Sequence, residues 1–413
     1  MGTAVEVAHR SPQARRIVIG LLAGEPSGDN LGAGLMQALK THLGEQSVSF
    51  IGVGGPRMQA EGLQVLADFE TLIVHGFREP LLRLPALYRL YRSLAATLVQ
   101  RKVDAFVGID FNVFNLMLER RLKRQGIPTA HYVSPSVYAW RRGRTKKVAQ
   151  SADKLFCLFP FEPEFYRECT VDARFIGHPL AAQITPETGS EEARQRAQST
   201  LGLASADVTL ALLPGSRSSE VRLMLQDMLQ AARLLAVQLG TRNQTLQVVV
   251  PCLNEARRAQ VKDLAEAFAD VAQLHYLGDA RLPLIACDLA LVKSGTSTLE
   301  TMLLRRPMVV TYRLGALTFF IAKALLKTPY IAIPNILAGR MLVPELVQKA
   351  ATPQAICQAL LEQLDQRLAQ SEYLDSFAQL HAQLAAGASG LGPSAGAALG
   401  VADLLEETQR EPS

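Results

Sequence analysis

The stretch Leu291-Val292-Lys293-Ser294-Gly295-Thr296-Ser297-Thr298-Leu299-Glu300 joins two different sequence patterns. The apolar run 287–292 before it predicts a buried strand ending at Lys293, and residues 301–304 after it predict a helix. Open α/β sheets bind ligands at such strand-to-helix loops, and a helix start suits a phosphate. Glu300, about a turn further on, would then reach a sugar hydroxyl. An ordinary turn with Ser294 or Thr296 as the N-cap explains the stretch equally well.

Composition sets the limits within which this loop is interpreted. The chain has 413 residues, 48% of them hydrophobic and 20% charged, which is typical of a globular protein of two or three domains. The net charge of +5 suits an anionic ligand or a lipid surface without requiring either. Its five cysteines form no CxxC pattern, which favours reduced residues of a cytosolic protein. No apolar run reaches the roughly 18 residues of a membrane span.

Apolar runs alternate with helical segments in both halves of the chain. The first half has predicted strands at 17–23, 49–53, 103–109, 129–133 and 154–159, with a helix at about 31–43. The pattern breaks near Gly177-His178-Pro179 and restarts with strands at 208–213, 246–250, 287–292 and 308–312. This alternation predicts the α/β class, with two Rossmann-like, doubly wound domains facing across a cleft.

In the first half, two strand ends carry candidate site residues. Glu25 and Ser27 lie in a Gly-rich loop after the first strand, where carboxylates suit hydroxyls better than a pyrophosphate; a tight turn with a helix cap is the alternative. Asp110 directly follows a buried strand, so it is a candidate general base, or else a helix cap.

In the second half, Arg217 follows a predicted strand in the loop 214–218. Arginine suits bidentate phosphate contact, although a surface ion pair with Glu220 is the alternative role for this side chain. Two such loops in one domain, 214–218 and 294–298, favour an anion site. Asn335, between apolar neighbours, predicts either a contact to a base or phosphate or a simple turn amide.

Two segments are candidates for a lipid surface. Arg141, Arg142 and Arg144 adjoin the only tryptophan, which fits an anionic lipid as well as a solvated helix face, while the lack of a broad basic stripe argues against nucleic acid. In the segment 72–98, leucines that include Leu81 and Leu82 interleave with arginines. This mixture predicts either an interfacial amphipathic helix or an ordinary helix packed on the sheet.

Taken together and in order, these motifs resemble the lipid-A-disaccharide synthase family of inverting GT-B glycosyltransferases, from about residue 17 to about residue 346. The resemblance rests on Ala23-Gly24-Glu25-Pro26-Ser27-Gly28-Asp29, Gly108-Ile109-Asp110, His131 to Trp140, Phe175 to Pro179, Leu213 to Arg217, Ser294 to Glu300 and Pro334 to Arg340. The chain departs from the usual Asp-x-Pro-Asp-Phe-Asn with Asp110-Phe111-Asn112-Val113-Phe114-Asn115, and it has Ala182 and Lys293 where the family usually has Asp and Ala.

The resemblance implies a reaction. UDP-2,3-diacylglucosamine would be the donor and 2,3-diacylglucosamine 1-phosphate (lipid X) the acceptor, giving the β-1,6-linked lipid A disaccharide 1-phosphate and UDP. Asp110 would be the general base, and contacts to UDP or the donor would come from Glu25, Ser27, Arg217, Ser294, Gly295, Thr296, Ser297, Glu300 and Asn335. No cofactor and no metal are implied. The protein would be cytoplasmic and peripheral on the inner membrane, and a homodimer stays open.

With these roles, we expect a flexible tail at 1–14, an acceptor and membrane domain at 15–182 and a UDP-sugar domain at 183–385. Residues 386–413 would form an Ala/Gly-rich tail with a last helix that either stays loose or returns to the first domain. A UDP-sugar 2-epimerase of the same fold is the alternative enzyme, and it would not need the membrane segment. A nucleotide-sugar or lipid-binding protein is the alternative that would not need Asp110.

Overall fold

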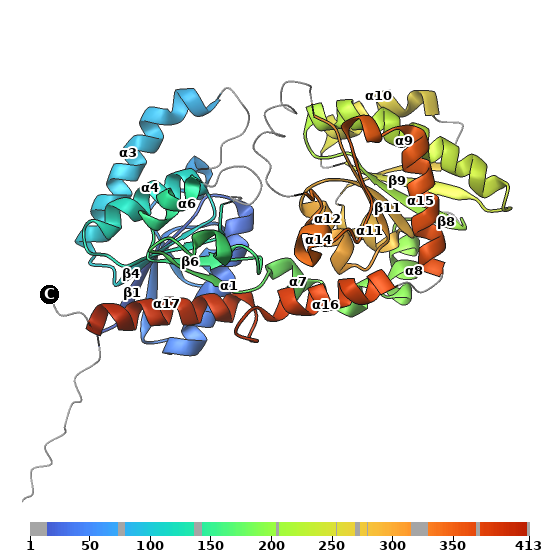
Figure 1. Cartoon of the computed structure of the whole chain (residues 1–413). Helices are drawn as coiled ribbons and strands as arrows, with labels where there is room; N and C mark the ends of the chain where they lie inside the picture. Colours follow the sequence, from blue (N-terminus) through green and yellow to red (C-terminus); the bar gives the residue numbers. More distant parts are fainter. Residues whose placement is uncertain are drawn as a thin grey trace, which may run out of the picture. The chain divides into compact units, whose positions relative to one another are not determined.

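The computed structural model describes residues 15–72, 79–135, 143–203, 206–252, 254–268, 273–278, 280–314, 329–368 and 372–410. They form two compact units (Figure 1). Unit 1 holds the described residues up to Gly177 and those from Gly387 onward, and unit 2 holds His178–Ala386. Each unit contains one parallel sheet with helices packed on it, as the alternating sequence pattern predicts.

The sheet of unit 1 has seven described strands in the order β3-β2-β1-β4-β5-β6-β7, all pairs parallel. The strands are β1 (Ile17–Ala23), β2 (Val48–Val53), β3 (Leu63–Val65), β4 (Ala105–Ile109), β5 (Thr129–Tyr132), β6 (Lys154–Cys157) and β7 (Asp172–Phe175). The two edge strands β3 and β7 were not predicted, because they are short and carry no apolar run. The inner strand β1 has β2 on one side and β4 on the other, so the strand order reverses between β1 and β4.

Helices cover both faces of this sheet (Figure 1). Helices α1 (Pro26–Leu43) and α17 (Pro393–Arg410) share one apolar cluster with the sheet, while α3 (Glu79–Gln100) and α4 (Asn112–Lys123) contribute to another. Shorter helical segments are α2 (Pro56–Ala60), η1 (Phe69–Thr71), α6 (Arg144–Ala149) and η2 (Pro163–Tyr166).

Most of the C-terminal segment is helical, where its Ala/Gly/Ser content predicted either a flexible or a loosely helical tail with a last helix. Helix α17 begins at Pro393 and packs along α1. The helix also lies close to β6, where Gly400 is needed, since a Cβ at Gly400 would lie 2.4 Å from the Phe156 ring. Ion pairs hold the helix on the sheet, with Lys154 Nζ 2.8 Å from Glu407 Oε1 and Arg174 paired with Asp403.

The sheet of unit 2 has six described strands in the order β10-β9-β8-β11-β12-β13, all pairs parallel. They are β8 (Val208–Leu213), β9 (Leu246–Pro251), β10 (Gln273–Leu277), β11 (Leu289–Lys293), β12 (Met308–Tyr312) and β13 (Glu345–Val347). Here the strand order reverses between β8 and β11. The described helical segments are α7 (Pro179–Gln183), η3 (Pro186–Gly189), α8 (Glu191–Thr200), α9 (Ser218–Gly240), α10 (Glu255–Ala265), η4 (Glu266–Phe268), α11 (Arg281–Ala286), α12 (Thr296–Leu303), α14 (Ile333–Ala338), η5 (Gln348–Ala350), α15 (Pro353–Leu368) and α16 (Glu372–Ala386).

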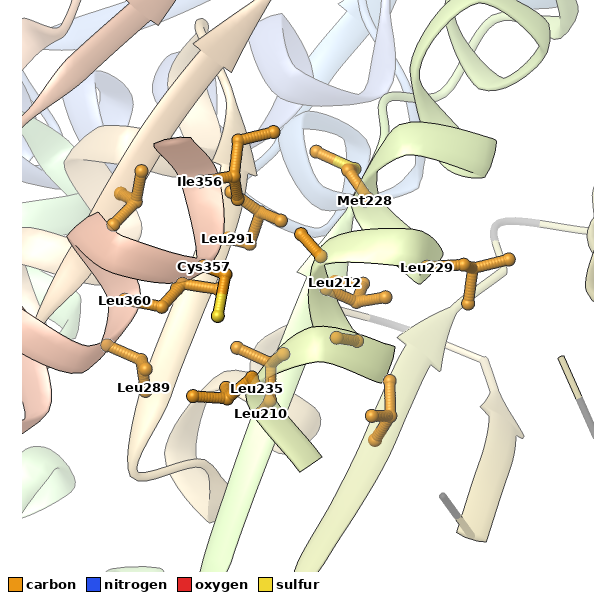
Figure 2. Close-up of a cluster of buried hydrophobic side chains, with 14 of the residues drawn as sticks. Leu210, Leu212, Met228, Leu229, Leu235, Leu289, Leu291, Ile356, Cys357 and Leu360 are labelled. Carbon is orange, nitrogen blue, oxygen red and sulfur yellow. The ribbon is translucent and has the colours of Figure 1, made fainter. Parts of the chain in front are cut away.

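Figure 2 shows the main core of unit 2, in which aliphatic side chains from β8, β11, α9 and α15 meet. Leu210, Leu212, Leu289 and Leu291 from the two central strands are all fully buried. Burying such side chains stabilises a fold by roughly 1.5–3 kcal/mol each. The strands that precede the predicted phosphate loops are therefore anchored in this core.

Two of the helices that follow predicted site loops start earlier than expected. Helix α1 begins at Pro26 rather than near Leu31, because proline at the first helical position has no N–H that needs a partner and a preset φ. Helix α12 begins at Thr296, so the predicted loop 294–298 consists of Ser294 and Gly295 followed by the first helical turn. The N-cap is Gly295, not Ser294 or Thr296.

The amphipathic segment 72–98 lies largely in α3. Leu94 and Leu98 in its second half are buried on the sheet, with Leu87 and Leu90 packed beside them, so this half is an ordinary packing helix. The helix includes Leu81 and Leu82, whose side chains lie outside the described residues. Among the described helices, none is long and apolar enough to span a bilayer.

Candidate functional site

The predicted site residues of unit 1 meet at the place where its strand order reverses. β1 and β4 are parallel neighbours, and Ala23 at the end of β1 pairs with Ile109 at the end of β4. Glu25 and Asp110 therefore leave the sheet at the same edge, which is where open α/β sheets bind ligands.

Asp110 sits in an unusual backbone conformation. Asp110 has φ 49° and Phe111 has φ 45°, so two consecutive non-glycine residues are left-handed. Such a conformation costs free energy and persists only where the surroundings enforce it. Asn115 enforces it here, because its buried Nδ2 donates to the carbonyls of Leu22, Ile109 and Asp110 at 3.2, 3.2 and 2.8 Å.

Gly24 makes room for this turn, since a Cβ there would lie 2.5 Å from the Phe111 ring. The Asp110 side chain does not cap α4: the N-cap of that helix is Phe111, and it makes no side-chain cap bond. The capping explanation for Asp110 is therefore wrong, and its carboxylate accepts from Asn112 Nδ2 at 3.2 Å instead.

Glu25 and Ser27 lie at the start of α1, Glu25 as its N-cap and Ser27 in its first turn. Loss of water contacts, and then the nearby Asp110 carboxylate, raise the pKa of Glu25 above its ordinary value. The neighbouring Asp29 is buried instead and accepts from the N–H groups of Arg57 and Met58, each at 3.0 Å. Two carboxylates therefore lie near the end of β1 and β4, while the third holds the start of α2.

The second cluster of predicted residues lies at the strand-order reversal of unit 2. β8 and β11 are parallel neighbours, and Leu213 pairs with Val292, so the loops after them emerge together. After β8, Gly215 has φ 111°, and a Cβ there would lie 2.4 Å from a Glu220 oxygen. This glycine lets the chain turn tightly into α9, whose N-cap is Arg217.

Arg217 forms the ion pair that the sequence offered as its alternative role. Its Nη1 lies 3.6 Å from Glu220 Oε1, and its backbone N–H donates to Glu220 Oε2 at 3.3 Å. The Arg217 side chain is 75% exposed, so this pair contributes little to stability. The guanidinium remains accessible to a ligand.

The start of α12 is suited to an anion. Gly295 has φ 153° and carries no side chain that could cap the helix, so the first N–H groups, including those of Thr296 and Ser297, lack a side-chain cap. Ser294 fixes the loop by donating from Oγ to the Ile331 carbonyl at 2.7 Å. A helix start of this kind attracts negative charge through its dipole and its N–H groups.

Lys293 is a site residue that the sequence analysis noted only as a departure from the family pattern. Its Nζ lies 3.1 Å from Glu220 Oε1 and 5.2 Å from the centre of the Tyr312 ring. Glu220 thus contacts both Arg217 and Lys293, which brings two cations to the same edge of the sheet. The signal that could have revealed Lys293 was a basic residue at the end of a buried strand directly before the glycine loop.

Glu300 and Asn335 both form hydrogen bonds within the protein, Glu300 through one carboxylate oxygen and Asn335 through its whole amide. Glu300 Oε1 accepts from Arg281 Nε at 3.2 Å. Asn335 is fully buried; its Nδ2 donates to the Val343 carbonyl and Glu345 Oε1, and its Oδ1 accepts from two backbone N–H groups. All four hydrogen-bonding positions of this amide are filled by the protein, so it shapes the segment that follows α14.

Of the three basic residues predicted to contact a lipid, the structure describes one. Arg144 is half-buried at the start of α6, while Arg141 and Arg142 lie outside the described residues.

Comparisons with known proteins agree with this architecture. The solved structure of MurG from Acinetobacter baumannii superposes with a TM-score of 0.50 at 15% identity, covering 95% of this chain and 99% of that one. A UDP-GlcNAc 2-epimerase from Neisseria meningitidis, solved with UDP-GlcNAc, gives a TM-score of 0.57 at 12% identity over 95% and 100% of the two chains. At such low identity these likenesses show the fold alone, which is GT-B.

The sequence comparisons are more specific. The family model described as lipid-A-disaccharide synthetase matches residues 19–390. The lipid-A-disaccharide synthase of Sodalis glossinidius is 47% identical over 373 residues, which are 90% of this chain and 95% of that protein.

Fold and site together define a GT-B enzyme with two parallel-sheet domains. The chain belongs to the lipid-A-disaccharide synthase family, and it is a glycosyltransferase of lipid A biosynthesis.

Proposed function

We propose that this enzyme transfers the 2,3-diacylglucosamine of its UDP-linked donor to the 6-hydroxyl of 2,3-diacylglucosamine 1-phosphate, releasing UDP. The observation that supports this most directly is that the two kinds of group needed for the reaction lie at the places where the strand order of each sheet reverses. One carries a strained, accessible carboxylate, and the other carries two cations beside a helix start. A glycosyl transfer needs both: a base for the attacking hydroxyl and positive charge for the leaving diphosphate.

On the acceptor side, Asp110 takes the proton of the hydroxyl as its oxygen bonds to the anomeric carbon of the donor. The carboxylate is half-buried and is held by the left-handed turn at the end of β4. Glu25 and Ser27 lie close enough to this edge to contact sugar hydroxyls. Burial, and then the negative charge of Asp110, raise the pKa of the Glu25 carboxyl, and its oxygens can accept hydrogen bonds from those hydroxyls.

On the donor side, the bond from the anomeric carbon to the diphosphate breaks, and its electron pair leaves with UDP. Arg217 and Lys293 neutralise the charge that develops, and the N–H groups at the start of α12 bind the diphosphate oxygens around Ser294, Gly295, Thr296 and Ser297. Glu300 binds the ribose, and Asn335 acts indirectly by fixing the segment after α14. We therefore assign the acceptor to unit 1 and the UDP-sugar to unit 2.

The decisive experiment is an assay of the purified chain with the two diacylated sugars, followed by thin-layer chromatography. We expect one disaccharide 1-phosphate and one UDP for each donor consumed. Product formation should depend on the acceptor. Release of UDP without disaccharide, or epimerisation of the UDP-sugar, would overturn the proposal.

Both substrates carry acyl chains, and we propose that the enzyme works peripherally on the cytoplasmic face of the inner membrane. The start of α3, with Leu81 and Leu82, is the segment proposed to contact lipid. Replacing both leucines with serine should reduce co-sedimentation with anionic liposomes several-fold, because buried apolar area drives interfacial binding.

The matched control for that experiment is Val99→Ser at the far end of the same helix, where the apolar side chain is 38% exposed. It should leave co-sedimentation unchanged. If the double serine variant sediments with liposomes as well as the unaltered protein does, this segment has no part in membrane binding.

A further inference from the structure

A chain of hydrogen bonds runs from the Asp110 carboxylate into the core of unit 1. Asn112 Nδ2 donates to Asp110 Oδ1 at 3.2 Å, and Asn112 Oδ1 lies 3.2 Å from His131 Nε2. His131 Nδ1 in turn lies 2.7 Å from Glu119 Oε1. The side chains of His131 and Glu119 are both fully buried, so this series of hydrogen bonds begins at the candidate base and ends in the interior.

The direction of each hydrogen bond follows from Asp110. An ionised carboxylate can only accept, so the NH₂ group of Asn112 must face it. The Asn112 carbonyl then faces His131, and Nε2 of the imidazole must carry a proton to bond with it. One further proton lies between His131 Nδ1 and Glu119 Oε1, so the buried pair has no net charge, which is the state that a low-dielectric interior tolerates.

A glycine provides the space that the His131–Glu119 pair occupies. His131 on β5 pairs in register with Gly108 on β4, and a Cβ at Gly108 would lie 2.1 Å from Glu119 Oε1. Glu119 Oε2 has no hydrogen-bond partner among the described residues, and burial raises the pKa of Glu119, which His131 partly offsets. A buried carboxyl group with an unbonded oxygen costs stability, and apolar side chains would fill this space at lower cost.

We propose that Asn112, His131 and Glu119 are positioning residues that orient the Asp110 carboxylate for the transfer reaction, an inference that rests on the proposed role of Asp110 as the base. Glu119 sets the proton position and ring orientation of His131, His131 fixes the Asn112 amide, and Asn112 holds Oδ1 of Asp110. Oδ2 is then the oxygen that receives the hydroxyl proton.

Asn112→Ala should lower kcat by about 10- to 100-fold, since small displacements of a reacting group are costly, while KM and the affinity for UDP change little. His131→Asn should have a similar effect, because asparagine can keep the contact to Glu119 but cannot reach Asn112. His131→Gln can reach Asn112 and should restore much of the lost rate. Val113→Ala, with a side chain 78% exposed on the same helical turn, is the control and should leave kcat unchanged.

Combining the variants separates positioning from a purely structural role. The double variant Asn112→Ala with His131→Asn should be no slower than either single variant, because each substitution already interrupts the same series of hydrogen bonds. In an Asp110→Asn background, Asn112→Ala should have no further effect on kcat. Unaltered kcat in both Asn112→Ala and His131→Asn, with Asp110→Asn still inactive, would overturn this inference but leave the proposed function standing; normal turnover in Asp110→Asn would remove both.

Discussion

Asp110→Asn should lower kcat by a factor of about 10²–10⁴, the contribution typical of a positioned general base. The amide cannot take a proton from the acceptor hydroxyl, so the hydroxyl must attack without losing its proton to the enzyme. The donor loops of unit 2 are untouched, so UDP should bind with unchanged affinity in a calorimetric titration.

Asparagine is the informative replacement at this position for a structural reason. Asp110 has φ 49°, and asparagine tolerates the left-handed region as readily as aspartate does. Alanine would add backbone strain and would confuse loss of the base with loss of the turn. The variant should therefore keep the melting temperature of the unaltered protein.

Asp263→Asn is a suitable control, because that carboxylate is exposed on α10 of unit 2 and belongs to neither candidate site. It should have normal turnover. Near-normal turnover of Asp110→Asn itself, with the same product, would exclude Asp110 as the base.

Arg217→Ala should weaken UDP binding by about 10- to 150-fold, which corresponds to the roughly 1.5–3 kcal/mol that hydrogen bonds to charged groups contribute. The side chain is 75% exposed and pairs only at 3.6 Å with Glu220 Oε1, so its removal should scarcely change stability. A phosphate ligand would gain far more from the guanidinium than the folded protein does. Isothermal titration with UDP measures the effect directly.

Arg222→Ala provides the matched control, since Arg222 is exposed on the same helix one turn further along. It should leave UDP affinity unchanged. Equal affinity of Arg217→Ala and the unaltered protein would show that Arg217 does not contact the diphosphate.

Much of the fold could be predicted because its signals are local. Central strands such as β1, β8 and β12 have the predicted bounds, since a buried parallel strand is a continuous apolar run. Edge strands such as β3 and β13 escaped prediction, because three residues carry too little periodicity. The start of α12 was also misplaced, since hydroxyl residues occur both in loops and in first helical turns.

Some residues of the candidate site could be predicted from the sequence, and others could not. Asp110, Arg217 and Ser294 follow buried strands, so their place at a sheet edge could be inferred from the sequence. Lys293 was seen only as a departure from the family pattern. Asn335 drew attention as a polar residue among apolar neighbours, yet the structure gives that amide four protein partners. Composition cannot distinguish a buried amide that serves the fold from one that serves a ligand.

The sequence by itself determined that the chain forms two parallel α/β units and where inner strands such as β1, β4 and β8 end, because hydrophobic periodicity is a property of neighbouring residues. Only the tertiary structure decided which strand ends lie side by side, how His131 and Glu119 reach the turn at Asp110, and that α17 packs on α1. These outcomes depend on strand pairing and on contacts between residues far apart in the chain. Local patterns do not record such contacts, and the chemistry at Asp110 depends on them.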